Sequence, residues 1–354
     1  MPKEINYSKG IFIILLCLSI IFFGAVIKIT SEVLLPITVA ILLSFVFHPI
    51  VKLLKEKFHI PSIIGILFIF IILCATIFVI GNLLFSSIKT ILTLYPKYEE
   101  RFTVIYEAVA NLFHLPFDSD SSLITNLWNQ LGVRNAVQSA ALTLSNNIIG
   151  FAKNVTVVAL FVIFLLSEIG FFKQKILQAF NGTSSDKITL IMKDIIQQVT
   201  KYISVKFFIS FLTGFFVALG TMIVKLDFPI VWGFLAFILN FIPNFGSIIS
   251  GVLTTLFALI QFWPSPAPVI WVGFVMLAVN MILGNFVEPK VQGRNLGISP
   301  FIIIVSLSLW GWLWGFLGMI LAVPMIVILK IICENVDFLK PISIIIGSKI
   351  SNKK

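Results

Sequence analysis

Charged residues are scarce in this chain of 354 residues. Only 11% of them are Asp, Glu, Lys or Arg, whereas 59% are hydrophobic. Soluble domains carry about 25% charged residues, which excludes a water-soluble globular domain. The composition predicts a protein embedded in a lipid bilayer. The net charge of +10 would suggest nucleic acid in a soluble protein, but here we assign it to the loops between spans and expect no nucleic-acid partner.

Cysteine and histidine are scarce as well, with three of each. Cys17, Cys74 and Cys333 lie in or beside apolar runs, without CxxC or CxxH spacing, so we interpret them as small buried side chains. The histidines are far apart in the sequence and form no ligand set. The sequence also lacks a nucleophile–base pair and a Gly-rich phosphate loop. We therefore predict no metal, no cofactor and no enzymatic activity.

Long apolar runs dominate what is present. A helix needs about 20 apolar residues to cross a bilayer. The sequence predicts an all-α polytopic membrane protein with about eight apolar helical segments. The uninterrupted ones are Ile11–Ile27, Val33–Phe47, Ile63–Leu84, Val155–Ile169, Phe207–Val224 and Val269–Val287. No small-x-small cleavage site follows the first run, which predicts an uncleaved span instead of a signal peptide.

Two further apolar runs are interrupted by helix-breaking residues. The first has arms Phe228–Asn240 and Ser247–Phe262, and the second has arms Ser299–Leu309 and Phe316–Ile331. Each arm would be about 17–24 Å long, which is short for a full span. Broken apolar segments that occur twice indicate the substrate site of a transporter. We predict two re-entrant helical hairpins; two full-span helix pairs with tight turns are the alternative.

The distribution of basic residues predicts the orientation. Most of the 25 Lys and Arg residues lie in segments that are cytoplasmic if the N-terminus is cytoplasmic, as the positive-inside rule requires. Both termini are then expected in the cytoplasm, in a multi-pass protein of the bacterial inner membrane. In this topology the two hairpins enter from opposite faces. Their tips are expected to meet near the bilayer midplane.

Composition also predicts a division of the chain. The predicted segments are the first three spans (1–88), an extracytoplasmic amphipathic helical module (89–153), the fourth span with a cytoplasmic amphipathic helix (154–206), the transport core (207–333) and a basic cytoplasmic tail (334–354). The module contains a loop at 116–122 and a second amphipathic run, Leu123–Ile149. It would either gate a pore or space subunits. The cytoplasmic helix, starting near Thr183–Asp186, would lie in the membrane interface or lead into the next span.

Several residues around the interrupted runs resemble those of one family, the autoinducer-2 exporters. The matching residues are Asn240, Pro243, Asn244, Gly246, Asn280, Asn285, Glu288, Pro289, Lys290, Gly293, Pro300, Gly315, Gly318, Ala322, Val323 and Pro324. The order of spans also fits, so the resemblance covers nearly the whole chain. It implies a multi-pass inner-membrane protein that exports the quorum-sensing signal autoinducer-2. Some members resemble sodium(lithium)/proton antiporters, and the resemblance also implies a homo-oligomer.

Two positions depart from the pattern of this family. Asn244 stands where an aromatic residue is usual. Tyr202 is followed by Ile203-Ser204-Val205, where the family commonly has an Arg-Gly pair. The first departure bears on the identity of the substrate.

The candidate substrate pathway is polar and aromatic. It consists of Asn240, Pro243, Asn244, Gly246, Asn280, Asn285, Trp310 and Trp314. Pro243 removes a backbone donor and Gly246 frees the backbone, which leaves polar groups for a small polar solute or a monovalent cation. The asparagines would alternatively cap helix ends or bind neighbouring helices, and the tryptophans would alternatively fill a packed turn.

The candidate gate or coupling residues are Glu288, Pro289, Lys290 and Glu168. Glu288 and Lys290 would form an ion pair that breaks in one conformation, or an interfacial pair beside a helix stop. A proton-coupled antiporter would have to use Glu168 or Glu288, since the other carboxylates lie outside apolar runs. The remaining alternative is a membrane scaffold without transport activity that binds its partners through the 89–153 module.

Overall fold

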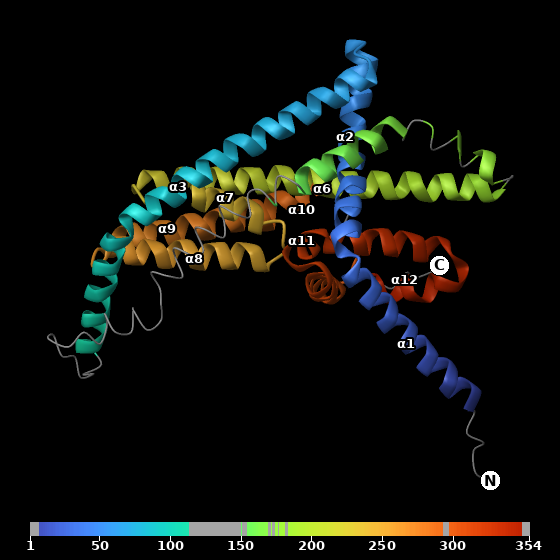
Figure 1. Cartoon of the computed structure of the whole chain (residues 1–354). Coiled ribbons are helices and arrows are strands. Elements are labelled where there is room, and N and C mark those ends of the chain that lie inside the picture. Colours follow the sequence, from blue (N-terminus) through green and yellow to red (C-terminus); the bar gives the residue numbers. More distant parts are fainter. Residues whose placement is uncertain are drawn as a thin grey trace, which may run out of the picture. The chain divides into compact units, whose positions relative to one another are not determined.

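The computed structural model describes residues 7–112, 150, 154–168, 171, 174–175, 177–180, 183–292 and 297–348. These residues are helical apart from turns and one isolated bridge between Ile298 and Gly347, so the predicted all-α class is confirmed. The loop at 116–122 and the run Leu123–Ile149 lie outside the described residues. The order of helices is shown in Figure 1.

The helices have the following bounds: α1 Tyr7–Ile29, α2 Ser31–Phe58, α3 Ser62–Leu112, α6 Thr183–Ile223, α7 Pro229–Leu239, α8 Phe245–Phe262, α9 Pro266–Val279, the π-helix Asn280–Val287, α10 Glu288–Gln292, α11 Pro300–Asn335, a 3-10 turn Asp337–Leu339 and α12 Lys340–Ile346. A further short apolar helix is Asn154–Glu168. Within the described part, five helices are long and apolar enough to cross a bilayer. They are Ser31–Phe58, Ser185–Ile223, Phe245–Phe262, Pro266–Gln292 and Pro300–Asn335.

Two of the helices are much longer than a bilayer requires. The predicted third span continues without a break into the predicted extracytoplasmic module, as the 51 residues of α3. At 1.5 Å per residue this helix is about 75 Å long, more than twice the hydrocarbon thickness of about 30 Å. A large part of α3 therefore lies outside the hydrocarbon.

Helix α6 joins the predicted cytoplasmic helix to the next span in one rod of 41 residues that begins at Thr183. In its first half Ile195 and Val199 are buried. Thr200 Oγ1 donates a hydrogen bond to the Phe45 carbonyl oxygen of α2, at 2.9 Å. These contacts favour a packing helix that leads into the span over one lying in the membrane interface.

The chain forms two compact units, each built from segments that are discontinuous in sequence. The first comprises Met1–Ser62, Val157–Lys201 and Leu296–Lys354. Within it α11 contacts α1, α2 and α12. The end of α12 is tied to the residues before α11, because Ser299 N donates to the Ile346 carbonyl at 2.9 Å and Ser348 N donates to the Gly297 carbonyl at 3.0 Å.

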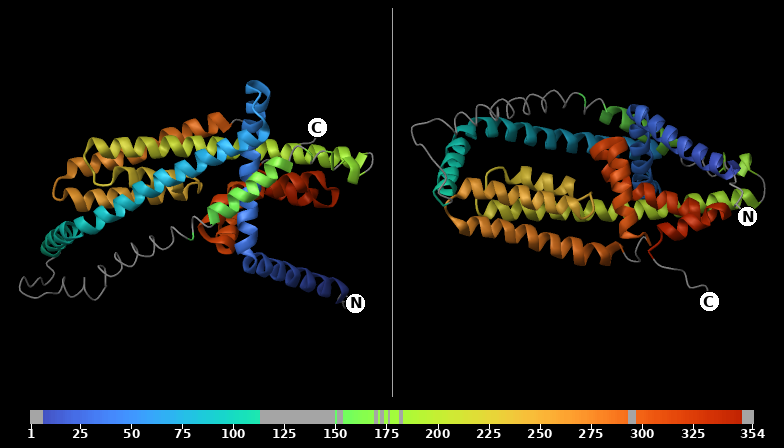
Figure 2. Two further views of the ribbon diagram at one scale, coloured as in Figure 1. Left: turned by 45° about the horizontal axis from the view of Figure 1, so that its top comes forward. Right: turned by 90° about the horizontal axis from the view of Figure 1, so that it is seen from below.

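The second unit comprises Ile63–Thr156 and Tyr202–Asn295. Its core is built where the second half of α6 meets α7, α8 and α9, which run alongside one another in Figure 2. The buried residues of this core are Val217, Leu226, Ala236, Ala258, Val272 and Met276. A Cβ placed on Gly233 of α7 would lie 2.5 Å from the Gly214 carbonyl oxygen of α6. Small residues allow this close approach, as in many membrane helix pairs.

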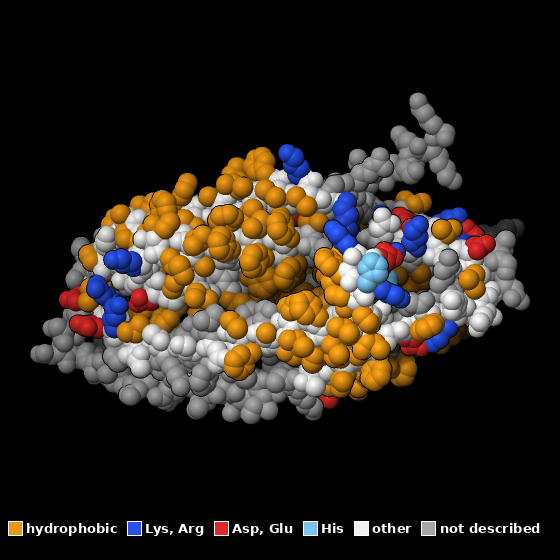
Figure 3. Space-filling view, turned by 90° about the horizontal axis from the view of Figure 1, so that it is seen from above, with side chains coloured by type: hydrophobic (Ala, Val, Ile, Leu, Met, Phe, Trp, Pro, Cys, Tyr) orange, Lys and Arg blue, Asp and Glu red, His pale blue; other side chains and the backbone are white. Residues whose placement is uncertain are grey.

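Large apolar side chains cover much of the surface seen in Figure 3. In the second unit Phe274 and Leu277 are 61% and 72% exposed, as expected for side chains that face lipid. Cys74 is exposed and Cys333 is buried. The expectation of a buried side chain is therefore wrong for Cys74, because it lies on an outward face of α3.

Candidate functional site

The first interrupted run folds as α7 and α8, which pack against each other. Between them Asn244 adopts a left-handed φ of 64°. Pro243 has no N–H, but its carbonyl oxygen accepts from Phe245 N at 2.8 Å, and the Ile242 carbonyl accepts from Gly246 N at 3.2 Å. The turn therefore satisfies part of the backbone that the sequence suggested would be left free.

Gly246 makes the reversal possible. A Cβ at this position would lie 1.6 Å from the Leu239 carbonyl oxygen. The obstacle is backbone, which cannot rotate away as a side chain can. Glycine is therefore required at position 246 because α8 approaches the end of α7 closely there, and not only because the turn needs a flexible residue.

The two asparagines of this turn have different environments. Asn240 is buried, and its Nδ2 donates a hydrogen bond to Ser210 Oγ of α6 at 3.0 Å. Asn244 is exposed, and no side-chain bond caps α8 from it. Asn240 therefore binds the turn to α6, as a polar residue between membrane helices commonly does. Asn244 presents an amide that can both donate and accept.

The span that carries Asn280 and Asn285 contains a π-helix, Asn280–Val287. Sequence patterns do not reveal this geometry, because it depends on a shift from i−4 to i−5 hydrogen bonding. A Cβ at Gly284 would lie 3.0 Å from Asn280 Oδ1, so the absence of a side chain at 284 leaves room for this amide. Asn280 is half-buried and Asn285 is exposed. Short π-helical segments are rare in proteins, and those that occur are often found at functional sites.

Glu288 directly follows the π-helix and forms an ion pair with Lys206 of α6. Lys206 Nζ lies 2.8 Å from Oε1 and 3.0 Å from Oε2 of Glu288. The two side chains are 6% and 17% exposed. The partner considered from the sequence was Lys290, which is exposed, as is Pro289. The sequence interpretation did not identify Lys206 as the partner of Glu288. Its position directly before the apolar run Phe207–Val224 is the signal that could have identified it.

The second interrupted run is α11, which reverses at Gly315, where φ is 64° and ψ is −143°. The arms 300–314 and 316–335 contact each other, because Ser306 Oγ donates to the Ala322 carbonyl oxygen at 2.8 Å. A Cβ at Gly318 would lie 1.9 Å from the Trp310 carbonyl oxygen. This turn therefore depends on a close backbone approach, as the α7–α8 turn does.

The tryptophans of this second turn are mostly engaged within the protein. The rings of Trp310 and Trp314 have centroids 4.7 Å apart. Trp314 is buried and its Nε1 donates to the Ile27 carbonyl oxygen of α1 at 3.4 Å. Lys28 Nζ lies 4.1 Å from the centroid of the exposed Trp312 ring. These contacts favour the packed-turn interpretation for Trp314.

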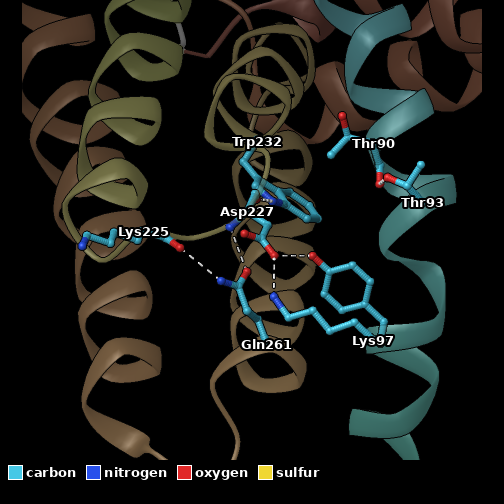
Figure 4. A network of polar contacts seen from close by, with 8 residues as sticks. Thr90, Thr93, Lys97, Lys225, Asp227, Trp232 and Gln261 are labelled. Carbon is cyan, nitrogen blue, oxygen red and sulfur yellow. Dashed lines mark hydrogen bonds and ion pairs between the residues drawn. The ribbon is translucent and has the colours of Figure 1, made fainter.

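A polar network links α3 to the loop between α6 and α7 (Figure 4). Asp227 Oδ2 accepts from the Tyr98 hydroxyl at 2.6 Å and lies 3.4 Å from Lys97 Nζ. Asp227 N donates to Gln261 Oε1 at 2.8 Å, so the C-terminal end of α8 is also part of this network. Partial burial and the Asp227 carboxylate raise the pKa of the Tyr98 phenol. The extension of α3 thus packs on one end of the second unit, and only the fold brings these residues together.

The other predicted carboxylate, Glu168, lies at the surface. It forms an ion pair with Lys175, and both side chains are more than half exposed. Among the described residues, no group of three or more His, Cys, Asp or Glu side chains is placed to hold a metal.

Five helices of the described residues are long and apolar enough to cross a bilayer, and large apolar side chains are exposed on their surfaces, which defines a multi-pass membrane protein. The family model described as AI-2E family transporter matches residues 12–337. The chain belongs to this family of transporters, which are not enzymes. The resemblance inferred from the Asn, Glu-Pro-Lys and Gly motifs is thereby confirmed.

Bacterial relatives match nearly the whole chain. A candidate transport protein of Borreliella burgdorferi is 33% identical over 98% of this chain and 95% of its own length. One from Haemophilus influenzae is 29% identical over 90% of both chains. The AI-2 transport protein TqsA of Escherichia coli is 26% identical over 95% of both chains.

Proposed function

We propose that this protein exports a small polar solute across the bacterial inner membrane, by alternating access at the tip of the α7–α8 pair. The observation that carries this proposal is the anchoring of that tip by Asn240 to Ser210, while Asn244 remains exposed beside it. A polar turn within the apolar depth of a membrane is tolerated only where it lines a cavity or is buried in protein.

The length of α6 supports placing this tip inside the hydrocarbon. The loop after Ile223 contains Lys225 and Asp227, so the end of α6 marks one edge of the bilayer. Ser210 lies 13 residues earlier, which is about 20 Å along the helix axis and within the core of about 30 Å. Helix α7 has only 11 residues, or about 16 Å, and is too short to cross. Both lengths support a re-entrant hairpin for this pair.

The α11 pair has the longer arms. The arms 300–314 and 316–335 are about 22 and 30 Å long, and the turn lies beside Ile27 at the end of α1. The arm 316–335 is long enough to cross, whereas 300–314 is short for a span. The contact of the turn with the end of α1 favours the full-span alternative for the second pair. The meeting of the two tips at the midplane stays a prediction. We therefore assign the solute first to Asn244 and the π-helical asparagines Asn280 and Asn285, and only then to Trp310.

Two observations support a substrate class: the tip is uncharged and rich in side-chain amides, and one relative is named for the solute that it transports. Side-chain amides suit hydroxyl and carbonyl groups of a neutral solute. The relative from Escherichia coli is named an AI-2 transport protein, so an autoinducer-2-like signal is the first solute to test. Cytoplasmic termini and a homo-oligomer remain part of this proposal.

Transport in proteoliposomes tests this proposal. Vesicles that contain purified protein are loaded with autoinducer-2, and release is followed for the wild type, Asn244→Ala and Asn335→Ala. Asn335 is the matched control, since its amide donates a hydrogen bond to the Ile331 carbonyl of its own helix. We expect release to fall several-fold in Asn244→Ala alone. Equal rates of autoinducer-2 release in all three proteins would show that Asn244 does not contribute to the pathway.

The buried carboxylate supports a second candidate, a sodium(lithium)/proton antiporter. Glu288 is largely buried within the protein, as coupling carboxylates of transporters commonly are, whereas Glu168 is exposed. This candidate predicts pH-dependent sodium flux that is lost in Glu288→Gln and retained in Glu168→Gln. Flux that persists in Glu288→Gln would reject it.

A further inference from the structure

Lys206 is the only charged residue that is buried among the described residues of the chain. Its side chain is 6% exposed and that of Glu288 is 17% exposed. Removing two charges from water costs several kcal/mol per ion, and the mutual attraction offsets this only while the pair is intact. Such a pair contributes little net stability compared with apolar residues, so its presence in a membrane segment indicates a functional role.

The position of the pair relates it to the candidate pathway. On α6 Lys206 precedes Ser210 by four residues, about one helical turn. Ser210 holds the α7–α8 tip through Asn240, at 3.0 Å. Lys206 lies 17 residues before Ile223, about 26 Å from that end of α6 and near the opposite edge of the hydrocarbon. In the topology expected from the basic residues, the ion pair therefore lies between the tip and the inner aqueous phase.

The π-helix determines which way Glu288 faces. Glu288 N donates to the Leu283 carbonyl oxygen, a bond to residue i−5 that ends the π-helix. A change from π to α hydrogen bonding in this segment would rotate Glu288 about the helix axis and away from Lys206. The phenol of Tyr202, buried one turn before Lys206 on α6, interacts electrostatically with Glu288. Lys290, on α10, is exposed.

We propose that the Lys206–Glu288 ion pair closes the inner end of the solute pathway, with Lys206 as the positioning residue that holds the π-helix against α6. This inference rests on the proposed function, because it requires a pathway at the α7–α8 tip. It differs from the gate considered from the sequence, in which Lys290 was the partner. When the pair separates, the tip becomes accessible from the cytoplasm.

Thiol accessibility tests the closure without knowledge of the solute. Cys17, Cys74 and Cys333 are replaced by alanine, and Asn244→Cys supplies the probe position. The full-length protein is then labelled with a membrane-impermeant maleimide, in inside-out and right-side-out vesicles. The variants are Lys206→Met, Glu288→Gln, the charge swap Lys206→Glu/Glu288→Lys, and Lys206→Arg. Lys290→Met is the matched control, since this lysine is exposed.

We expect labelling of position 244 in inside-out vesicles to rise about tenfold or more in both neutralised variants, because breaking a buried pair costs more than the ~1.4 kcal/mol that a tenfold population shift requires. Lys206→Arg and Lys290→Met should label as the parent does, and the charge swap should return labelling toward the parent level. Monodisperse elution in detergent identifies variants that have folded. If one neutralised variant does not fold, the other one and the charge swap carry the test.

Two results overturn the closure. One is unchanged inside-out labelling in folded Lys206→Met and Glu288→Gln, while position 244 still reacts from the outer face. The other is a folded charge swap that labels as strongly as the neutralised variants, because the pairing itself would then be irrelevant. Absence of labelling from either face in every variant would instead overturn the proposed pathway, and the closure with it.

Discussion

Gly214 of α6 and Gly233 of α7 face each other so closely that a Cβ on either would lie within 2.6 Å of the carbonyl oxygen of the other. Gly233→Ala should therefore force the two helices apart. We expect a loss of about 2–3 kcal/mol of unfolding free energy, typical of overpacking. Thermal unfolding in detergent measures this effect.

Gly251→Ala is the matched control for that helix pair. A Cβ at Gly251 would lie 3.8 Å from Met276 Cβ, an ordinary contact. Alanine in a helix interior is favoured over glycine by about 0.5–1 kcal/mol. The control should consequently be neutral or more stable than the wild type. A similar loss in both variants would contradict the close α6–α7 approach.

The two turns should be equally intolerant of alanine. Gly246→Ala and Gly318→Ala each place a Cβ within 2 Å of a backbone oxygen, so we expect losses of about 3 kcal/mol or more. Gly273→Ala is the control, with its nearest neighbour at 3.8 Å. The folded fraction after heating, measured by size-exclusion chromatography, compares the three. Wild-type behaviour of Gly246→Ala would show that α7 and α8 do not reverse as described.

The bond between Asn240 and Ser210 should be measurable as a coupling energy. Ser210→Ala, Asn240→Ala and the double variant form a cycle of unfolding free energies. Interhelical hydrogen bonds in membrane proteins average about 0.6 kcal/mol, with values up to about 1.7. Because Ser210 is fully buried, we expect a value toward the upper end. A coupling of zero would mean that Asn240 does not hold the tip.

The Tyr98–Asp227 contact predicts a pH dependence outside the membrane. The folded pKa of Tyr98 is raised, chiefly by burial and also by Asp227, so its stabilising effect is complete below the unfolded value of about 10 and is lost as pH rises above it. We expect Tyr98→Phe to lower the free energy of unfolding by about 1–2 kcal/mol at neutral pH. This difference should shrink in unfolding scans from about pH 8 to about pH 11. A difference that grows with pH would contradict the assignment.

Much of the second unit could be predicted from the sequence because apolar length and helix breakers act locally. The arms around Phe241–Gly246 are the observed α7 and α8 apart from boundary shifts of a few residues. The start of α6 at Thr183 also followed from local signals. The continuity of α3 through residue 88 could not be predicted from such signals. A change from apolar to amphipathic composition does not by itself end a helix.

The candidate site was predicted only in part. Asn240, Gly246 and Glu288 were identified by residue type and resemblance, but their partners come from other segments. Lys206 lies 82 residues from Glu288 in sequence, and Asp227 lies 129 from Tyr98. The π-helix was also invisible, because its residue pattern is that of any apolar helix. Long-range pairing and hydrogen-bond register are set by packing, which no single sequence window contains.

The depth of residue 244 in the membrane tests the central claim most directly. A nitroxide is attached to Asn244→Cys in liposomes, and its collisions with oxygen and with a water-soluble nickel complex are measured by electron paramagnetic resonance. We predict a depth of about 20 Å below the outer surface, inside the hydrocarbon, together with access to the nickel complex. A nitroxide at the inner aqueous boundary, or one at that depth that only oxygen reaches, would contradict a re-entrant tip that lines a pathway.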